Sequence, residues 1–476
     1  MTEGPEVGGH GQLLRALSLR QTTALVIGSV IGTGIFLKAA PMTQLLEKPS
    51  LVLLAWLAAG ILSLAGALTY AELGAMLPKA GGDYVYLREA YGRLPAFLSG
   101  WTSVAVIATG VIAALGTAFA TFLSVFIPLD AVWIERTFHF LGEDVHWRIG
   151  IAQVVTVAII LLFSGLNTRG VALGGQIQWV LTAAKILGIA IIVVGAFLLS
   201  RQGSWANLRD PAASAAAAAA GGAATVSAFG AAMVAALWAY QGWSQMPMAA
   251  GEIDNPGRNI PRGLIYGMVI VLVVYLITNL AYFYALPTAE ILTASSTAHR
   301  DALPVATKAA NSFLGTAGGK VISVLFLMSV VGALNGVTLM TSRVPFAMAR
   351  DRLFFQSLGH VDPHTHVPVR AIWVQGIWGS LLALSGTFDQ LTTSAIFAQW
   401  LTFGFSAAAV FVLRRKMPNA ERPYRVLGYP VVPALFVLIA AWLVVNTLKT
   451  SPVESAAGLV LVALGVPFYL YFRRAN

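Results

Sequence analysis

Long apolar segments alternate with short polar ones along the whole chain of 476 residues. Each segment is about as long as the roughly 20 residues that an α-helix needs to cross a bilayer. The pattern predicts twelve such helices, near residues 20–46, 50–77, 96–127, 148–165, 172–200, 225–250, 262–286, 318–349, 368–385, 389–414, 430–448 and 456–472. We therefore expect an all-α membrane protein with twelve transmembrane helices.

The composition supports this class and excludes several others. Hydrophobic residues make up 57% of the chain and charged residues 11%, and the mean hydropathy is +0.76. A soluble domain carries about 25% charged residues, so an ordinary soluble domain, a disordered chain and a coiled coil are excluded. The chain has no Cys. This excludes thiolate metal sites, Cys nucleophiles and a disulfide-linked partner.

The positive charge predicts the orientation of the chain in the membrane. The net charge is +10, and most of the 30 Lys and Arg residues fall on the side of the predicted helices that carries the N-terminus. Cytoplasmic loops of membrane proteins are rich in Lys and Arg, so this bias accounts for the net positive charge. No nucleic-acid partner is needed to explain it. We expect a multi-pass protein of the cell inner membrane with both termini in the cytoplasm. Residues 1–19 show no cleavable signal peptide and are expected to form a cytoplasmic segment.

Two of the predicted helices carry breaks in matching positions. The first contains Gly28–Phe36 (GSVIGTGIF), and the sixth contains Trp238–Ser244 (WAYQGWS), followed by Pro247. Close packing through small residues is one interpretation of the glycines. The other is a substrate site, because interrupted helices at equivalent positions of two inverted halves are typical of secondary transporters.

The second interpretation predicts the domain organisation. The first and sixth helices begin on opposite sides of the membrane, so helices one to five and six to ten form a five-plus-five inverted repeat. Two C-terminal helices follow it. The corresponding ranges are 20–200, 225–414 and 430–472.

Broken helices have a chemistry of their own. Where a helix unwinds, free N–H groups suit a carboxylate and free C=O groups suit an ammonium group. A break with both features is complementary to the zwitterionic part of an α-amino acid. No charged side chain is needed for this recognition.

These segments also resemble a known family. The stretches are GSVIGTGIF (28–36), AELGAMLPKAGGDYVYLREAYG (71–92), LTAAKILG (181–188), ALWAYQGW (236–243), GEIDNPGRNIPRG (251–263), NGVTLMTSR (335–343) and ERPYRVLGYP (421–430). They resemble the amino acid–polyamine–organocation superfamily, and within it the L-type amino acid transporters and their bacterial relatives. The resemblance implies the twelve-helix inverted-repeat fold and amino acid transport.

The resemblance also implies which residues bind substrate. Thr33 and Gly34 would donate to the carboxylate, and the carbonyl groups of Val30, Trp238 and Gln241 would accept from the amino group. Trp238 would also lie over the substrate as an aromatic gate. The full expected set is Val30, Ile31, Gly32, Thr33, Gly34, Trp238, Ala239, Gln241 and Ser244, the last with Ala239 at the side-chain pocket.

Lys185 is the most unusual residue of the predicted helices. A Lys inside a membrane span is costly unless it faces a cavity or a partner. The resemblance places it against the first and eighth helices, where sodium-coupled relatives hold a cation, so we expect sodium-independent transport. Two roles stay open. A fixed charge would go with exchange, and a Lys that loses its proton would go with proton coupling.

Three further residues have two interpretations each. Asn335 either lies near the site or joins two helices by hydrogen bonds, and Phe397 and Trp400 either line the outer vestibule or pack between helices.

The most consistent function is a secondary transporter of neutral L-amino acids, because no acidic residue lies deep in a helix near the breaks. A transporter of cationic amino acids or polyamines is the alternative with the same fold. An intramembrane enzyme is the alternative of another class, but the predicted spans lack paired carboxylates, His ligands and a nucleophile. We expect no catalytic residue, no cofactor and no metal site. The expected partners are an amino acid, the lipid bilayer and, under proton coupling, a proton.

Overall fold

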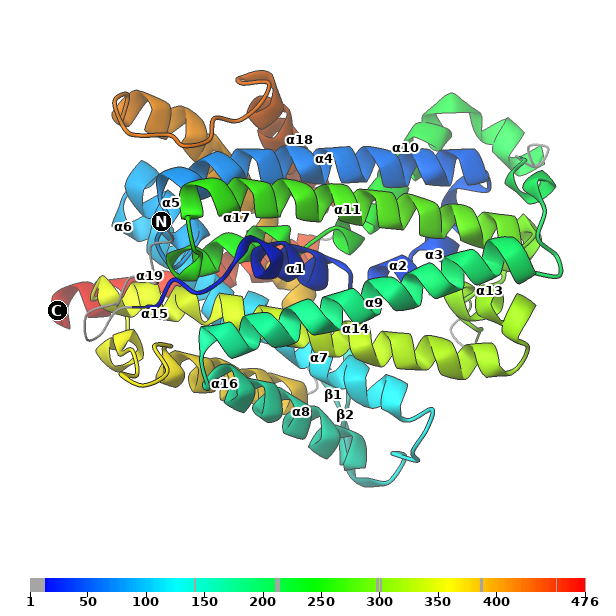
Figure 1. Ribbon diagram of the computed structural model, residues 1–476, viewed down its shortest axis with the longest axis horizontal. Coiled ribbons are helices and arrows are strands. Elements are labelled where there is room, and N and C mark those ends of the chain that lie inside the picture. The colour runs from blue at the N-terminus through cyan, green and yellow to red at the C-terminus, as the bar shows by residue number, and fades with distance from the viewer. Residues whose placement is uncertain are drawn as a thin grey trace, which may run out of the picture.

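The computed structural model describes residues 13–140, 143–209, 215–296, 299, 302–385, 388–450 and 452–475. Long helices run side by side along the long axis of the molecule (Figure 1). The expected segment 1–19 is described only from residue 13 onward.

The described residues of the first half of the chain, up to Leu199, form the following elements. They are α1 (Leu19–Val30), α2 (Gly34–Leu37), α3 (Ala39–Leu46), α4 (Pro49–Met76), α5 (Asp83–Tyr91), α6 (Arg93–Thr102), the π-helical turn η1 (Ser103–Ile107), α7 (Ala108–Leu123), a β-hairpin described below, α8 (Ile151–Asn167) and α9 (Val171–Leu199).

The second half begins with the 3₁₀ turn η2 (Trp205–Leu208) and is again helical in its described residues. Its elements are α10 (Ala215–Ala239), the 3₁₀ helix η3 (Trp243–Glu252), α11 (Pro256–Ala285), α12 (Thr288–Leu292), α13 (Val305–Leu314), α14 (Ala317–Thr341), α15 (Arg343–Arg350), the 3₁₀ turn η4 (Gln356–Gly359), α16 (Val369–Ser385), α17 (Phe388–Lys416), α18 (Val431–Thr450) and α19 (Pro452–Ala475).

Within the described residues, nine helical segments are long and apolar enough to cross a membrane. The chain is therefore a multi-pass membrane protein. Most predicted segments lie within a few residues of an observed helix, as 50–77 does for Pro49–Met76 and 172–200 for Val171–Leu199. The arrangement of twelve spans as inverted repeats stays a prediction.

A β-hairpin interrupts the helices and was not predicted. Strands β1 (Val132–Phe140) and β2 (Glu143–Gly150) pair antiparallel. The run VWIERTF is rich in β-branched and aromatic residues, which favour strands, and it was missed because only long apolar segments were sought. The predicted helix start at 148 is wrong by three residues, since Arg148–Gly150 complete β2 and α8 begins at Ile151. The indole N–H of Trp147 donates to the carbonyl of Leu384 at 2.7 Å, which ties the hairpin to α16.

The alanine-rich stretch before α10 is partly helical. Residues 210–214 lie outside the described part, and α10 begins at Ala215. Alanine is the strongest helix former, which favours the helical start of α10.

The two broken helices lie at the centre of the bundle. Figure 1 shows α1 as a short helix between α9 and α11, and it also packs against α14 and η3. Ser18 begins α1 with a capping box, in which its N–H donates to the side chain of Gln21 at 2.9 Å. Gly28 fits the packing interpretation of the glycines, because a Cβ there would meet the side chain of Gln178 on α9.

A buried ion pair fixes the end of η3. Both side-chain oxygens of Glu252 accept from Arg343 at 2.7 Å, and both side chains are fully buried. Such a pair is strongly destabilised by removal of one partner, because the other charge is left buried. It holds the far end of the second broken helix against the start of α15.

Candidate functional site

The two breaks touch each other. Gly242, at the turn between α10 and η3, has a φ of +119°, and a Cβ there would lie 2.6 Å from the carbonyl oxygen of Ser29. A Cβ on Gly34, at the start of α2, would lie 2.6 Å from the Cβ of Ala239. The side chain of Ser29 also lies within hydrogen-bond distance of the Gly242 carbonyl, at 3.2 Å. Glycine is therefore needed where the two interrupted helices meet.

Local sequence explains both interruptions. At the end of α1 the Gly32 N–H turns back to the carbonyl of Val30 at 2.8 Å, a three-residue turn that ends the helix. In the second break Gly242 takes the left-handed conformation, and Pro247, inside the 3₁₀ helix η3, has no N–H to donate to a helical hydrogen bond.

The breaks leave backbone groups free on both sides. Within the described chain, the N–H groups of Thr33, Gly34 and Ile35 donate no hydrogen bond, and the carbonyl of Gln241 accepts none. Unpaired backbone groups at this depth need a partner, because lipid offers none. The donors suit a carboxylate and the acceptor suits an ammonium group.

Other carbonyl groups of the first break already accept hydrogen bonds from side chains. The ammonium group of Lys185 on α9 donates to the carbonyls of Gly28 at 3.1 Å and Ile31 at 2.5 Å. The hydroxyl of Ser329 on α14 donates to the Ile31 carbonyl at 2.9 Å. Lys185 is 1% exposed, so its charge is held in the interior by these oxygens.

Tyr275 on α11 joins the two breaks. Its hydroxyl lies 2.9 Å from the carbonyl of Val30 and 2.9 Å from the carbonyl of Ala239. One hydroxyl has one hydrogen, so it donates to one of the two at a time. Sequence analysis missed this residue, because a Tyr in an apolar segment carries no signal that distinguishes it from a packing residue.

A cavity of about 150 Å³ lies against both breaks. This volume is below the range of about 300–1,000 Å³ typical of sites for drug-sized ligands, so the cavity leaves room for a small molecule only. Seven of the nine predicted substrate-binding residues line it: Val30, Gly32, Thr33, Gly34, Trp238, Ala239 and Gln241. Residues not predicted complete the lining: Ser29, Val111, Leu115, Gly242, Gln245, Ala333, Val337 and Gln399. None of these lining residues is acidic or basic.

The other two predicted residues lie beside this cavity. Ile31 is fully buried, with its carbonyl directed to Lys185 and Ser329. Ser244 is 2% exposed and lines a neighbouring cavity. Trp238 is 41% exposed, and the ammonium group of Lys38 lies 4.4 Å from the centre of its ring.

Asn335, Phe397 and Trp400 are not among the residues that line the central cavity. The side chain of Asn335 is fully buried and donates to the carbonyl of Gly174 at 3.1 Å and to the side chain of Gln178 at 2.9 Å. These hydrogen bonds join α14 to α9, which corresponds to the interpretation of Asn335 as a residue that links two helices. Phe397 is buried, and Trp400 packs edge-on against Phe403.

Within the described part of the chain, no three His, Asp or Glu side chains gather as metal ligands. The loop 360–366 (HVDPHTH) contains three His residues and Asp362. The carboxylate of Asp362 accepts hydrogen bonds from the backbone N–H groups of His364 and Thr365, each at 2.9 Å. These hydrogen bonds lower the pKa of Asp362.

Comparison with known proteins identifies a family and several relatives. The amino acid permease family model matches residues 17–466. The chain is 31% identical over 459 residues to the serine/threonine exchanger SteT of Bacillus subtilis (strain 168), with 96% of both chains covered. It is 29% identical over 461 residues to the human cystine/glutamate transporter, covering 97% of this chain and 86% of that protein. It is also 29% identical over 464 residues to the human b(0,+)-type amino acid transporter 1, covering 97% and 88%.

Proposed function

The chain belongs to the amino acid permease family, and we propose that it is a sodium-independent secondary transporter of neutral L-amino acids. Members of this family are transporters rather than enzymes. In this proposal the substrate lies in the cavity between the two breaks. Alternating access moves this cavity between the two sides of the cell inner membrane, with both termini in the cytoplasm.

The observation that carries the proposal is the pairing of free donors and a free acceptor across one cavity. Thr33 and Gly34 offer N–H groups to the substrate carboxylate, and Gln241 offers its carbonyl to the amino group. The carbonyl of Val30, expected to share this role, already accepts from Tyr275. The Trp238 carbonyl likewise accepts from the N–H of Gln241 at 3.3 Å. The Gln241 carbonyl therefore carries more of the ammonium binding in this proposal.

The lining of the cavity favours a neutral side chain. A cationic substrate side chain would be stabilised by an acidic group, and none of the lining residues of the central cavity is acidic. The serine/threonine exchanger among its relatives has a name that fits small neutral substrates. Trp238 is assigned to the gate over the substrate, and Ala239 to the border of the side-chain pocket.

Lys185 is assigned the place of a coupling cation. Its ammonium group donates to two carbonyls of the first break, where a bound sodium ion would otherwise be coordinated by the same kind of oxygen. Two versions of the cycle follow. A permanent charge at Lys185 goes with exchange, and a proton lost from it in the cycle goes with proton-coupled uptake.

The proposed layout is twelve helices. The first repeat covers 20–200, the second 225–414, and two further helices lie within 430–472. On this layout the breaks after Val30 and Ala239 are equivalent positions of the two repeats, which is the expected arrangement of a transporter site.

The test is uptake of labelled serine by proteoliposomes in sodium-free buffer. Vesicles are loaded with or without unlabelled serine, and each is measured with and without an inward proton gradient. We expect uptake without sodium that neutral amino acids compete for. Uptake that needs internal serine means exchange, and uptake driven by the gradient into empty vesicles means proton symport. A requirement for sodium, or competition only by arginine and polyamines, contradicts the proposal.

A further inference from the structure

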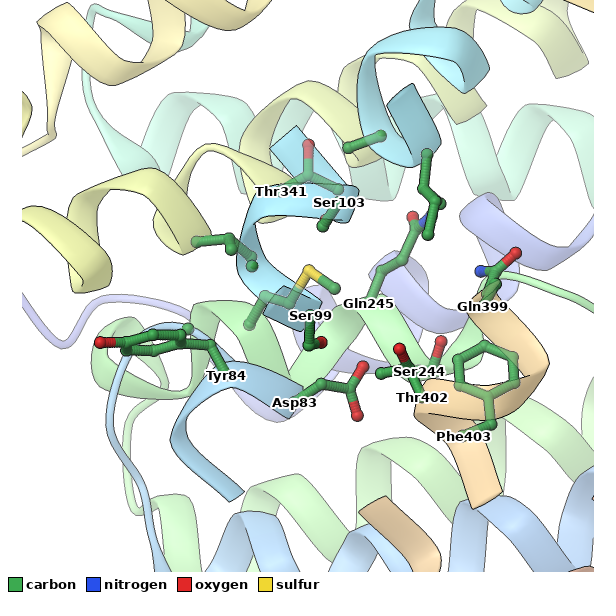
Figure 2. Close-up of a pocket in the computed structure, with 16 residues that line it drawn as sticks. Asp83, Tyr84, Ser99, Ser103, Ser244, Gln245, Thr341, Gln399, Thr402 and Phe403 are labelled. Carbon is green, nitrogen blue, oxygen red and sulfur yellow. The ribbon is translucent and has the colours of Figure 1, made fainter. Parts of the chain in front are cut away.

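A second cavity adjoins the central one at the end of the bundle that carries α5. Its volume is about 30 Å³, room for a group the size of a water molecule or an ammonium group. Residues of α5, α6, η1, η3, α14 and α17 line it (Figure 2). Gln245 and Gln399 line both cavities. The two cavities therefore adjoin each other at these side chains, and the second lies on the side of the α5 end.

Among the described residues that line this second cavity, Asp83 is the only one with a charged side chain. Figure 2 shows it pointing into the cavity, towards Ser244 and Thr402. Asp83 is 6% exposed, and the hydroxyl of Tyr70 donates to its carboxylate at 2.6 Å. The hydroxyl of Ser406 also lies close to this carboxylate. No Lys, Arg or His of the described chain forms an ion pair with it.

A second acceptor in the cavity, the side-chain oxygen of Gln245, lacks a donor within the described residues. Gln245 is 8% exposed, and its side-chain oxygen has no hydrogen-bond partner among the described residues. A buried acceptor without a donor is unfavourable, because it has lost its hydrogen bonds to water. A buried carboxylate that lacks a cation costs more, and such groups in membrane proteins mark paths of ions or substrates. Both residues thus favour a ligand that carries N–H donors and positive charge.

We propose that this second cavity is a binding station for the ammonium group of the transported amino acid, held by the Asp83 carboxylate between the central cavity and the α5 end. The inference rests on the proposed function. Gln245, which faces both cavities, supplies the next acceptor along the path. The hydroxyl groups of Ser244 and Thr402 supply further oxygens around the carboxylate.

The protonation of Asp83 should control this station. Burial raises the pKa of Asp83 to about 6, although the hydrogen bond from Tyr70 acts in the opposite direction. The titratable groups that face it are Tyr70 from α4 and Tyr86 from α5, and Tyr84 is the other titratable residue of the lining. The carboxylate is therefore charged above about pH 6 and neutral below it. Ammonium binding should weaken as the pH on the α5 side falls from 7.5 to 5.5.

The test measures exchange from each face of the protein separately. The end of α19 lies at the α5 end, since the ring centres of Phe97 and Phe472 are 6.4 Å apart. An affinity tag at the C-terminus therefore selects proteoliposomes in which the α5 end faces outward. For Asp83→Asn we expect the half-saturating serine concentration on that face to rise about tenfold. The opposite face should change less than about twofold, and Asp83→Glu should recover most of the affinity.

Asp351→Asn is the matched control. Asp351 is an acid at the same end, paired with Arg88, and it does not line the cavity. This variant should leave both half-saturating concentrations unchanged. The inference is overturned if Asp83→Asn changes neither face, changes both faces equally, or alters only the response to a proton gradient. Wild-type protein that carries no amino acid would instead overturn the proposed function.

A measurement on the wild-type protein covers the case in which Asp83→Asn does not fold. Methylammonium and tetramethylammonium are added to the α5 face during serine exchange. Methylammonium has N–H donors and tetramethylammonium has none, so we expect only the first to compete, and only from this face. Equal inhibition by the two ions, inhibition from both faces, or no inhibition overturns the inference.

Discussion

Replacing Tyr275 by Phe removes one oxygen atom from the centre of the protein. This oxygen lies 2.9 Å from the carbonyl of Val30 and 2.9 Å from the carbonyl of Ala239, one at each break. Val30 keeps a second donor, since the Gly32 N–H lies 2.8 Å from it. The carbonyl of Ala239 has no other donor within the described chain, so the variant leaves it unpaired.

The expected cost follows from these contacts. One net hydrogen bond contributes about 0.5–1.5 kcal/mol, and leaving its buried acceptor unpaired brings the loss to about 1–3 kcal/mol. We therefore expect Tyr275→Phe to lower the free energy of unfolding by about 1–3 kcal/mol. We also expect slower exchange, because the hydroxyl holds the ends of both interrupted helices in one arrangement.

Tyr282 provides a matched control on the same helix. It is 1% exposed, close to the 0% of Tyr275, but its hydroxyl has no hydrogen-bond partner among the described residues. Tyr282→Phe removes the same atom without removing a hydrogen bond, so the free energy of unfolding should stay the same or rise slightly. Both variants are compared with wild type by reversible denaturant unfolding in mixed micelles and by serine exchange in proteoliposomes.

The reasoning is refuted if the two variants lose the same free energy, or if Tyr275→Phe loses none. Equal losses would mean that the oxygen contributes through packing and not through the two carbonyls. A stable Tyr275→Phe would mean that the break at Ala239 finds another donor or stays hydrated.

Three further predictions concern other parts of the molecule. Lys185→Met should slow serine exchange about tenfold or more while the protein still folds, because two carbonyls of the first break lose their donor. The control variant Lys320→Met changes an exposed residue and should transport serine normally. Glu252→Gln should lower the free energy of unfolding by about 3–5 kcal/mol, measured by thermal or denaturant unfolding, because Arg343 is left charged and buried. Glu135→Gln breaks an exposed ion pair and should lower it by only about 0–1 kcal/mol. Trp238→Ala should raise the half-saturating serine concentration about tenfold and admit larger amino acids as competitors, and unchanged kinetics would remove Trp238 from the site.

Local sequence was sufficient for the helices and for the location of both breaks. A segment of about 20 apolar residues is driven into helix by the lack of water in the bilayer, whatever its neighbours are. Gly32 and Gly242 likewise end their helices through local backbone geometry, so the breaks were visible as glycine-rich stretches. The same local signals were too weak for the hairpin Val132–Gly150, whose strands are short and lie outside the long apolar segments.

Only the tertiary structure decided which side chains donate hydrogen bonds to the backbone carbonyls freed at the breaks. Lys185 lies 157 residues from Gly28, Tyr275 lies 245 residues from Val30, and Ser329 lies 298 residues from Ile31. The sequence drew attention to Lys185 because a charge in a span is costly, but a buried hydroxyl such as that of Tyr275 leaves no comparable mark. Asp83 was missed for a related reason: its local sequence indicates a surface helix, and its burial follows from packing against distant segments. The backbone groups freed by a break must find partners, and folding alone determines which side chains can reach them.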